Sequence, residues 1–329
     1  MIVINEFEKA LPSEKGWVVS IGNFDGLHKG HQAILKEACR LASQRNTPGV
    51  MAITFEPHPT KILRPSKAPV CITPIEHKLY LFEKAGVDAV GVVHDSYELL
   101  NMPPEKFIDE FLVGKLRPAA VVEGEDFEFG YGRSGNVDML REVGKDRGFD
   151  VFTVELEKMS FSRGESEKIA SSLIRHFIEK GRISDVTAAT GRPYRLIGTV
   201  SRGRGIGKSL GFPTANLEPV SQMIPAEGVY AGWVQVSQSL EDAGRQGRLI
   251  EAVFSLGRAK TFITGHPLLI EAHILEENFS ENLYDKWLAM DFVDQIRKQR
   301  RFESADELKA QIAKDCAESR RILANARFN

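Results

Sequence analysis

The sequence predicts an α/β chain in two parts, a doubly wound parallel sheet followed by a small antiparallel β-barrel with a terminal helix. In the first half, short apolar runs alternate with helical patterns, which is typical of parallel sheets. In the second half, strand-like runs are joined by Gly, Pro and polar residues without long helices, which is typical of a small barrel. A length of 329 residues is also large for a single core, so we expect two domains.

The first half contains five runs that we expect to be strands, at 17–21, 50–55, 87–93, 119–123 and 149–155. After the first run, apolar residues recur at helical spacing, at Ile34, Leu35, Ala38, Leu41 and Ala42. Ligands of such Rossmann-like sheets bind beyond the carboxyl ends of the strands. The loops that follow the strands are therefore where chemistry is expected.

The second half contains four runs that we expect to be strands, at 195–201, 228–236, 249–256 and 268–275. A terminal helix is expected over 304–324, with Ser304 and Glu307 forming a capping box. Leu308, Ile312 and Cys316 would share one face of this helix. The pattern changes within 181–193, which predicts domains at 1–185 and 186–329. A fragment that starts near Gly181 is expected to fold by itself, because its strands pair mainly among themselves.

The overall charge and the cysteines narrow the class of protein. Lys and Arg total 43 against 45 Asp and Glu, a net charge of -2, so no global attraction to nucleic acid or to an anionic membrane is expected. No apolar run reaches the ~18 residues of a membrane span, and the N-terminus lacks the pattern of a secretory signal. The three cysteines form neither a metal-ligand pair nor a disulfide framework. We expect a cytoplasmic monomer or weak oligomer that acts on small molecules, with no nucleic acid and no membrane as partner.

A glycine-rich turn follows the first expected strand and leads into the first expected helix. It places His28 and His31 three residues apart, with Gly22, Gly26 and Gly30 around them. Glycines let a backbone approach a ligand closely, and a helix start attracts anions. Two imidazoles on one phosphate would stabilise the charge that develops during nucleotidyl transfer. The alternatives are a plain turn with two surface histidines, or a metal pair, for which no third ligand is evident nearby.

The pattern Gly-x-Phe-Asp-Gly-x-His-x-Gly-His resembles the HxGH nucleotidyltransferase superfamily and its FMN adenylyltransferase branch. Segments 54–59, 124–130 and 170–175 agree with that branch in order, although singly a proline-stiffened loop or an exposed helix charge would explain them. In the last segment Ala170 and Ser172 replace the usual Ser and Thr, and the hydroxyl at 172 is kept.

This resemblance implies particular residues for adenylyl transfer. Charge stabilisation would come from His28, His31 and Arg175. Contacts to ATP would come from Gly22, Asn23, Phe24, Asp25, Gly30, Asp126, Arg133, Ser171 and Ser172. Contacts to the flavin would come from Phe55, His58 and Pro59.

A second glycine-rich segment, at 203–209, is not a P-loop. Arg202 stands where the first Gly of that motif is needed, and 210–213 does not read as a helix. A basic loop that binds phosphate through backbone amides and Arg204 or Lys208 is the better account. Thr214 and Asn216 follow as two oxygen donors suited to Mg²⁺, although a plain Pro turn with an Asn cap explains that tetrapeptide alone.

Segment 203–216 and the later segments 228–231, 270–273, 283–284 and 296–297, with Phe302, resemble the riboflavin kinase family in order and approximate spacing. The resemblance implies a small antiparallel barrel in which Thr214 and Asn216 hold magnesium–ATP. Glu271 would be the general base for the ribityl 5′-hydroxyl, the alternative being an outward charge on an alternating strand. Further ATP contacts are implied for Gly203, Gly207, Lys208 and Pro213.

The second half also departs from that family. Segment 255–261 lacks the usual Asn and Pro, and Ile206 and Lys208 stand where Arg is common. The sequence predicts two reactions, riboflavin plus ATP giving FMN, and FMN plus ATP giving FAD and pyrophosphate, with Mg²⁺ as cofactor. Alternatives are a monofunctional FMN adenylyltransferase with a degenerate kinase module, a flavin-sensing binding protein, or another HxGH enzyme such as a tRNA-charging one.

Overall fold

The chain folds into two compact units, each described by itself. The computed structural model describes residues 1–7, 16–94, 96–155, 158–164, 166–202, 207, 210–219, 221–258, 268–277, 279 and 281–326. The first unit contains Met1–Val70 and Lys78–Lys158, and the second contains Cys71–His77 and Met159–Asn329. The segment Cys71–His77 therefore belongs with the second half of the chain.

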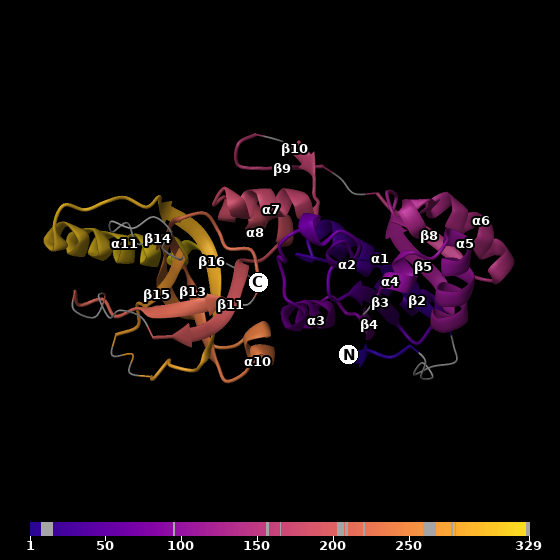
Figure 1. The fold of residues 1–329 in the computed structure, drawn as a ribbon, viewed down its shortest axis with the longest axis horizontal. Helices are drawn as coiled ribbons and strands as arrows, with labels where there is room; N and C mark the ends of the chain where they lie inside the picture. The colour runs from indigo at the N-terminus through magenta and orange to yellow at the C-terminus, as the bar shows by residue number, and fades with distance from the viewer. Residues whose placement is uncertain are drawn as a thin grey trace. The chain divides into compact units, whose positions relative to one another are not determined.

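The first unit is built on a six-stranded parallel sheet with strand order β1-β4-β3-β2-β5-β8 (Figure 1). The five strands expected from the sequence are confirmed. The edge strand β1 was missed because it is short and largely exposed. The strands are β1 (Ile2–Ile4), β2 (Trp17–Ile21), β3 (Val50–Phe55), β4 (Ala89–Val93), β5 (Pro118–Gly124) and β8 (Asp150–Val154).

Helices cover both faces of this sheet, which confirms the doubly wound prediction. Alternate side chains of β2, including Val19, pack in one core with the π-helix η2 (Phe107–Leu116). Helix α1 (Lys29–Arg45) contacts β2, β3, β5 and β8 through its buried face. The other helices are α2 (Pro59–Leu63), α3 (Ile75–Lys84), α4 (Tyr97–Leu100), α5 (Pro104–Lys106) and α6 (Val137–Arg147).

The strand order locates the binding crevice of the sheet. From β2 the chain adds β3 and β4 on one side, and β5 and β8 on the other. Ligands of open α/β sheets bind at the carboxyl ends of the strands where the order reverses. That point lies at the end of β2, where the sequence predicts the nucleotide-binding turn.

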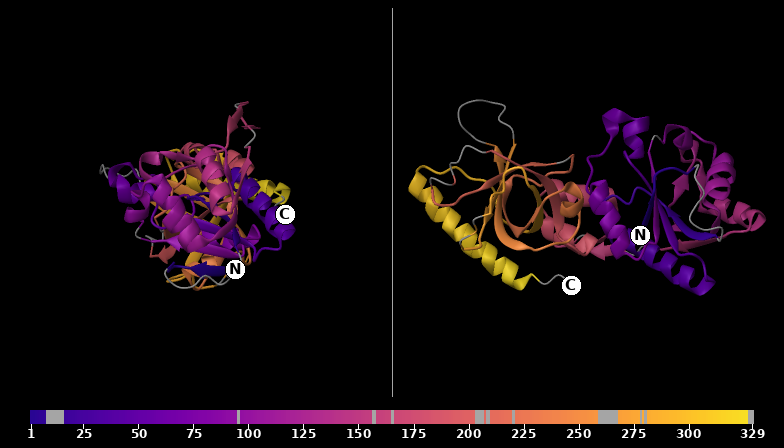
Figure 2. Two further views of the ribbon diagram at one scale, coloured as in Figure 1. Left: turned by 90° about the vertical axis from the view of Figure 1, so that its right-hand side faces the viewer. Right: turned by 90° about the horizontal axis from the view of Figure 1, so that it is seen from below.

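The second unit is built on a closed antiparallel barrel with strand order β11-β12-β15-β14-β13-β16 (Figure 2). The four strands expected from the sequence are confirmed. The barrel strands are β11 (Tyr194–Ser201), β12 (Ala215–Pro219), β13 (Gly228–Ser237), β14 (Ile250–Arg258), β15 (Leu268–Ile274) and β16 (Trp287–Arg297).

Strand β16 was missed because two acidic residues interrupt its apolar pattern, and β12 because it is short. Asp291 of β16 is nevertheless buried, because Arg195 of β11 forms an ion pair with it at 2.6 Å. A buried charge is tolerated when such a partner is present.

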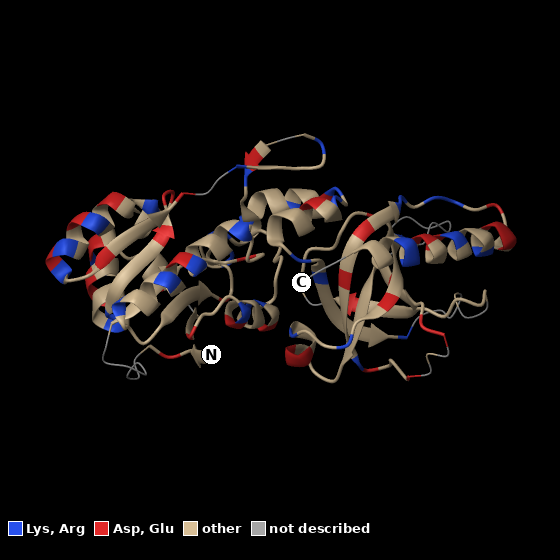
Figure 3. Ribbon diagram, turned by 180° about the vertical axis from the view of Figure 1, so that it is seen from behind, with Lys and Arg blue, Asp and Glu red and all other residues tan. Residues whose placement is uncertain are grey.

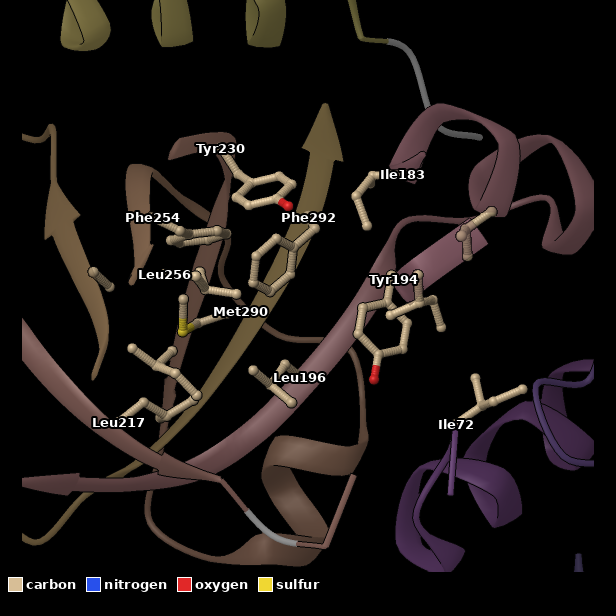
Figure 4. Packing of buried hydrophobic residues seen from close by; sticks show 14 of the residues in the cluster. Ile72, Ile183, Tyr194, Leu196, Leu217, Tyr230, Phe254, Leu256, Met290 and Phe292 are labelled. Atoms are coloured by element: carbon tan, nitrogen blue, oxygen red, sulfur yellow. The ribbon is translucent and has the colours of Figure 1, made fainter. Parts of the chain in front are cut away.

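The barrel is filled by aromatic and branched side chains, with the rings of Tyr230, Phe254 and Phe292 in contact (Figure 4). The expected terminal helix is confirmed as α11 (Ala305–Asn325), and Cys316 on it packs against the outside of the barrel. Ser304 caps this helix by accepting from Glu307 N at 3.1 Å. Acidic and basic residues both occur along α11, as the red and blue stretches of its ribbon show (Figure 3). No described helix combines the length and apolarity of a membrane span.

Segment Cys71–His77 and two helices complete the core of the second unit. Ile72 is 2% exposed and lies in the same cluster as residues of α7 (Ser171–Glu179) and α8 (Ile183–Thr190). Gln222 donates to the Ile72 carbonyl at 3.1 Å, and the His77 ring contacts the Gly244 carbonyl. The barrel strands alone therefore do not bury their whole core. This packing argues against the expectation that a fragment from about residue 181 folds by itself.

We expect the fragment 181–329 to aggregate or to unfold without a cooperative transition, because it lacks Ile72 and α7. In the full chain, Ile72→Ala should lower the free energy of unfolding of the second unit by about 2–5 kcal/mol. Denaturant unfolding measures this, with Val70→Ala at an exposed position as the control. A monomeric fragment with a sharp thermal transition would contradict the expectation.

Candidate active sites

The turn after β2 carries the first site. Gly22 N donates to the Ile53 carbonyl of β3 at 2.9 Å, which fixes the start of the turn. Phe24, Gly26 and Leu27 then have φ values of 49°, 85° and 33°. Non-glycine residues in this left-handed region are uncommon and cluster at functional sites. The turn delivers the chain to α1 with His28 as its N-cap.

The two histidines lie together at the start of α1. Their rings are stacked with centroids 3.6 Å apart and an angle of 18° between the planes. His28 Nδ1 accepts from His31 N at 3.3 Å, so the proton of a neutral His28 ring is on Nε2. Phe24 is 2% exposed and packs edge-on against His31 at 5.2 Å. The Phe24 side chain thus supports the His31 ring, and its expected contact with ATP stays a prediction.

The loop after β3 adjoins this turn. Thr54 Oγ1 donates to the Asn23 carbonyl at 3.1 Å, which joins the predicted flavin-side loop to the nucleotide-binding turn. Phe55 ends β3, and Pro59 is the first residue of α2. His58 caps α2 by accepting from Thr60 N at 3.1 Å. All three predicted flavin contacts thus lie at the carboxyl edge of the sheet.

The loop after β5 reaches the same edge, because β5 is parallel to β2 and adjacent to it. Asp126 is the second residue after β5, and a Cβ on Gly124 would lie 3.0 Å from Asp126 Oδ1. Arg133 is further along, on an exposed turn where it lies 3.7 Å from Glu128. The structure therefore places both predicted ATP contacts on this loop.

Glu123, the residue before Gly124, is a buried carboxyl that the sequence reasoning did not single out. It is 3% exposed and accepts from Ile21 N at 2.6 Å. Burial raises the pKa of Glu123 well above its usual value, and the hydrogen bond from Ile21 only partly opposes this. An acid inside an apolar run gives no sequence signal of its burial.

This raised pKa predicts how stability depends on pH. Above the ordinary pKa of Glu, the unfolded chain ionises Glu123 while the folded chain keeps its proton. Raising the pH from that value through the raised pKa therefore favours unfolding. Glu123→Gln removes the effect, so its melting temperature relative to the parent should be higher at pH 8 than at pH 5. Thermal unfolding at both values tests this, with exposed Glu125→Gln as control; equal differences at both pH values would contradict it.

The predicted motif at 170–175 starts helix α7 in the second unit. Ala170 is its N-cap and makes no side-chain capping bond, whereas Ser171 and Ser172 occupy the first turn. Ile174 is buried in the barrel cluster, and Arg175 is partly exposed.

The second site is a row of polar side chains on the outside of the barrel. Asn216 of β12 pairs directly with Glu271 of β15, and Glu271 pairs in turn with Ser255 of β14. Directly opposed residues point to the same face of a sheet. Their neighbours Ala215 and Ala272 belong to the interior cluster, so the polar row faces outward.

Thr214 joins this row from the residue before β12. Its Oγ1 donates to Glu271 Oε1 at 3.3 Å. A Cβ on Gly207 would collide with the Phe212 carbonyl and would lie 3.1 Å from Thr214 Oγ1, so a glycine is needed at this close approach. The structure thus brings Gly207, Thr214, Asn216 and Glu271 together. The predicted ATP contacts Gly203 and Lys208 lie outside the described residues.

Two further residues support this row and were missed. His273, two residues beyond Glu271 on the same face of β15, contacts the Pro213 carbonyl through Nδ1 at 2.8 Å. Gln299 donates to Ser255 Oγ at 3.1 Å. The period of two along β15 was a signal for His273, whereas Gln299 follows β16, which was itself not predicted.

The outer row offers ligands that fit Mg²⁺. The hydroxyl oxygen of Thr214 and the amide oxygen of Asn216 are hard donors that lie beside Glu271, and Mg²⁺ usually takes few protein ligands beside phosphate and water. Among the described residues no group of three or more His, Cys, Asp or Glu could hold a metal ion.

Comparisons with known proteins match a different family to each half of the chain. The FAD synthetase family matches residues 11–172, and the riboflavin kinase family matches residues 190–323. The expected boundary between residues 185 and 186 lies between these ranges and stays a prediction.

Relatives match nearly the whole chain. The bifunctional riboflavin kinase/FMN adenylyltransferase of Escherichia coli (strain K12) is 33% identical over 302 residues, covering 92% of this chain and 91% of that protein. The protein of the same name from Bacillus subtilis (strain 168) is 30% identical over 313 residues, covering 94% and 93%. The crystal structure of a macrolide-efflux protein from Streptococcus pneumoniae matches with a TM-score of 0.81 and 24% identity, covering 97% and 98%. That likeness concerns the fold alone.

Proposed function

The chain belongs to the family of bifunctional riboflavin kinase/FMN adenylyltransferases, and we propose that its two reactions occur at the two sites described above. Both steps of FAD biosynthesis follow from the family, with ATP as co-substrate and the flavins as substrates and products. The stacked His28–His31 pair at the switch point of the sheet carries the assignment of adenylyl transfer. The Thr214–Glu271 contact carries the assignment of the kinase reaction.

In the proposed adenylyl transfer, a phosphate oxygen of FMN attacks the α-phosphorus of ATP in line. A new P–O bond forms, the bond to pyrophosphate breaks, and no covalent enzyme intermediate is involved. The Nε2–H of His28 and the His31 ring donate to the charge that develops on the phosphate oxygens. Arg175 is proposed to add a positive charge, and the loops after β3 and β5 would hold the flavin and the nucleotide.

In the proposed kinase step, Glu271 takes the proton of the ribityl 5′-hydroxyl as its oxygen attacks the γ-phosphorus of ATP, and ADP leaves. Thr214 and Asn216 would hold a magnesium ion, which when bound neutralises phosphate charge. The Thr214 hydroxyl donates to Glu271 Oε1, which orients the carboxylate for this proton transfer.

The direct test is incubation of the protein with riboflavin, ATP and Mg²⁺, followed by chromatography for FMN and FAD. The proposal expects both products in sequence, and FAD alone when FMN is supplied. Omitting Mg²⁺ tests the proposed metal. FAD from FMN without FMN from riboflavin would favour a monofunctional adenylyltransferase, and flavin binding without either product would favour a sensor.

We also propose that the protein is a cytoplasmic monomer or weak oligomer without nucleic acid or membrane partners.

A further inference from the structure

Lys78 is a buried lysine beside the first site. It lies in α3 and is 4% exposed. Lysines are almost never buried to this extent unless an opposite charge pairs with them. Within the described part of the chain, Lys78 makes one hydrogen bond, from Nζ to Thr54 Oγ1 at 3.4 Å, and no ion pair. An ammonium group has three donors, so this contact leaves most of its capacity and all of its charge unmatched.

The single partner of Lys78 lies where the two substrate-binding segments meet. Thr54 begins the predicted flavin-side loop, and its Oγ1 also donates to the Asn23 carbonyl in the nucleotide-binding turn. Phe82, one turn further along α3, packs edge-on against Phe24 at 5.1 Å. Helix α3 is thus fixed against the same turn that positions His31, and it holds Lys78 at that junction.

A buried cation without a counter-charge lowers the stability of the empty protein. Such a group is useful when the charge that it lacks arrives with the substrate. Phosphate suits it, because an ammonium group binds phosphate oxygens as a point charge.

We propose that Lys78 binds the phosphate groups that react in adenylyl transfer, those of FMN or of ATP. This proposal rests on the proposed location of adenylyl transfer. It adds a phosphate contact to those proposed for His28 and His31.

Lys78→Met tests the proposal because it removes the charge and keeps most of the side-chain bulk. We expect kcat/KM for FAD formation from FMN to fall by about 10²–10³, the usual cost of losing one charge-stabilising donor. Lys78→Arg should recover part of this loss. A rise confined to the KM for FMN would assign the contact to the flavin phosphate, and one confined to the KM for ATP would assign it to the nucleotide.

Thermal unfolding without substrates distinguishes this role from a structural one. A substrate-binding lysine predicts that Lys78→Met is as stable as the parent or more stable, since the unmatched charge is gone. A structural lysine predicts lower stability together with lower activity, and that result would overturn the proposal, as would full activity in a folded Lys78→Met protein. If Lys78→Met does not fold, Lys78→Gln is the second variant to measure. Failure of both variants to fold would show that the lysine is structural and that the proposal is wrong.

Two measurements make the test specific. Lys84→Met alters an exposed lysine of the same helix and should change neither activity nor stability appreciably. FMN formation from riboflavin, measured on each sample, should be unaffected by Lys78→Met. If it fell in parallel with FAD formation, the effect would not be local to the first site. Failure of the proposed adenylyl transfer can be told apart from failure of the Lys78 proposal, because in that case the parent protein itself would form no FAD from FMN.

Discussion

Replacing Glu271 by Gln should lower the rate of FMN formation from riboflavin by about 10²–10⁴, the usual contribution of a general base. Gln keeps the shape and can still accept from Thr214 Oγ1, but it cannot take a proton. The hydrogen bond from Thr214 Oγ1, at 3.3 Å in the parent, and the strand pairing with Asn216 should survive. The barrel should therefore stay folded. Initial rates with saturating riboflavin, ATP and Mg²⁺ measure the effect.

The control for this change is Glu218→Gln, an exposed carboxylate on the adjacent strand β12. It should leave FMN formation unchanged, and both variants should still convert supplied FMN to FAD. Full kinase activity in Glu271→Gln would show that the base lies elsewhere and that Glu271 is an outward charge. No phosphorylation by the parent protein would instead favour the monofunctional alternative.

Most of the fold follows from patterns that are local in the sequence. Strands buried on both faces read as apolar runs, and β2, β3, β4 and β5 were found in this way. The fifth predicted strand of the sheet, β8, is only partly buried. The barrel was harder, because a strand can contain charges that are matched only in three dimensions. Asp291 is read as a polar interruption in the sequence, yet Arg195 neutralises it inside the folded unit.

The functional residues likewise fall into those that the sequence predicts and those that only the folded structure reveals. The polar row at 214–216 and 271 and the turn at 22–31 stand out because several chemical groups are close in sequence or match a known motif. Lys78 is one lysine within a helix, and nothing in the sequence distinguishes it from exposed Lys84. Segment Cys71–His77 is similar, because its place in the barrel core depends on contacts with residues more than a hundred positions away.

Replacing His28 or His31 by Ala should lower the rate of FAD formation from FMN by about 10²–10³, or about 2.7–4 kcal/mol in the activation barrier. The two rings are stacked 3.6 Å apart and His28 Nδ1 accepts from His31 N, so each positions the other. The double variant should therefore lose less than the product of the two single losses, because residues in contact are not additive. Rates of FAD formation for the two single variants and the double variant measure this coupling.

FMN formation from riboflavin is the internal standard for these histidine variants, because it should stay near the parent rate in each of them. Lys36→Ala, at an exposed position of the same helix α1, is the matched control and should leave both reactions intact. Loss of both reactions in a folded His28→Ala protein would contradict the assignment of the two steps to separate sites. Strictly multiplicative losses would leave each histidine a role but would show that the stacked arrangement does not couple them.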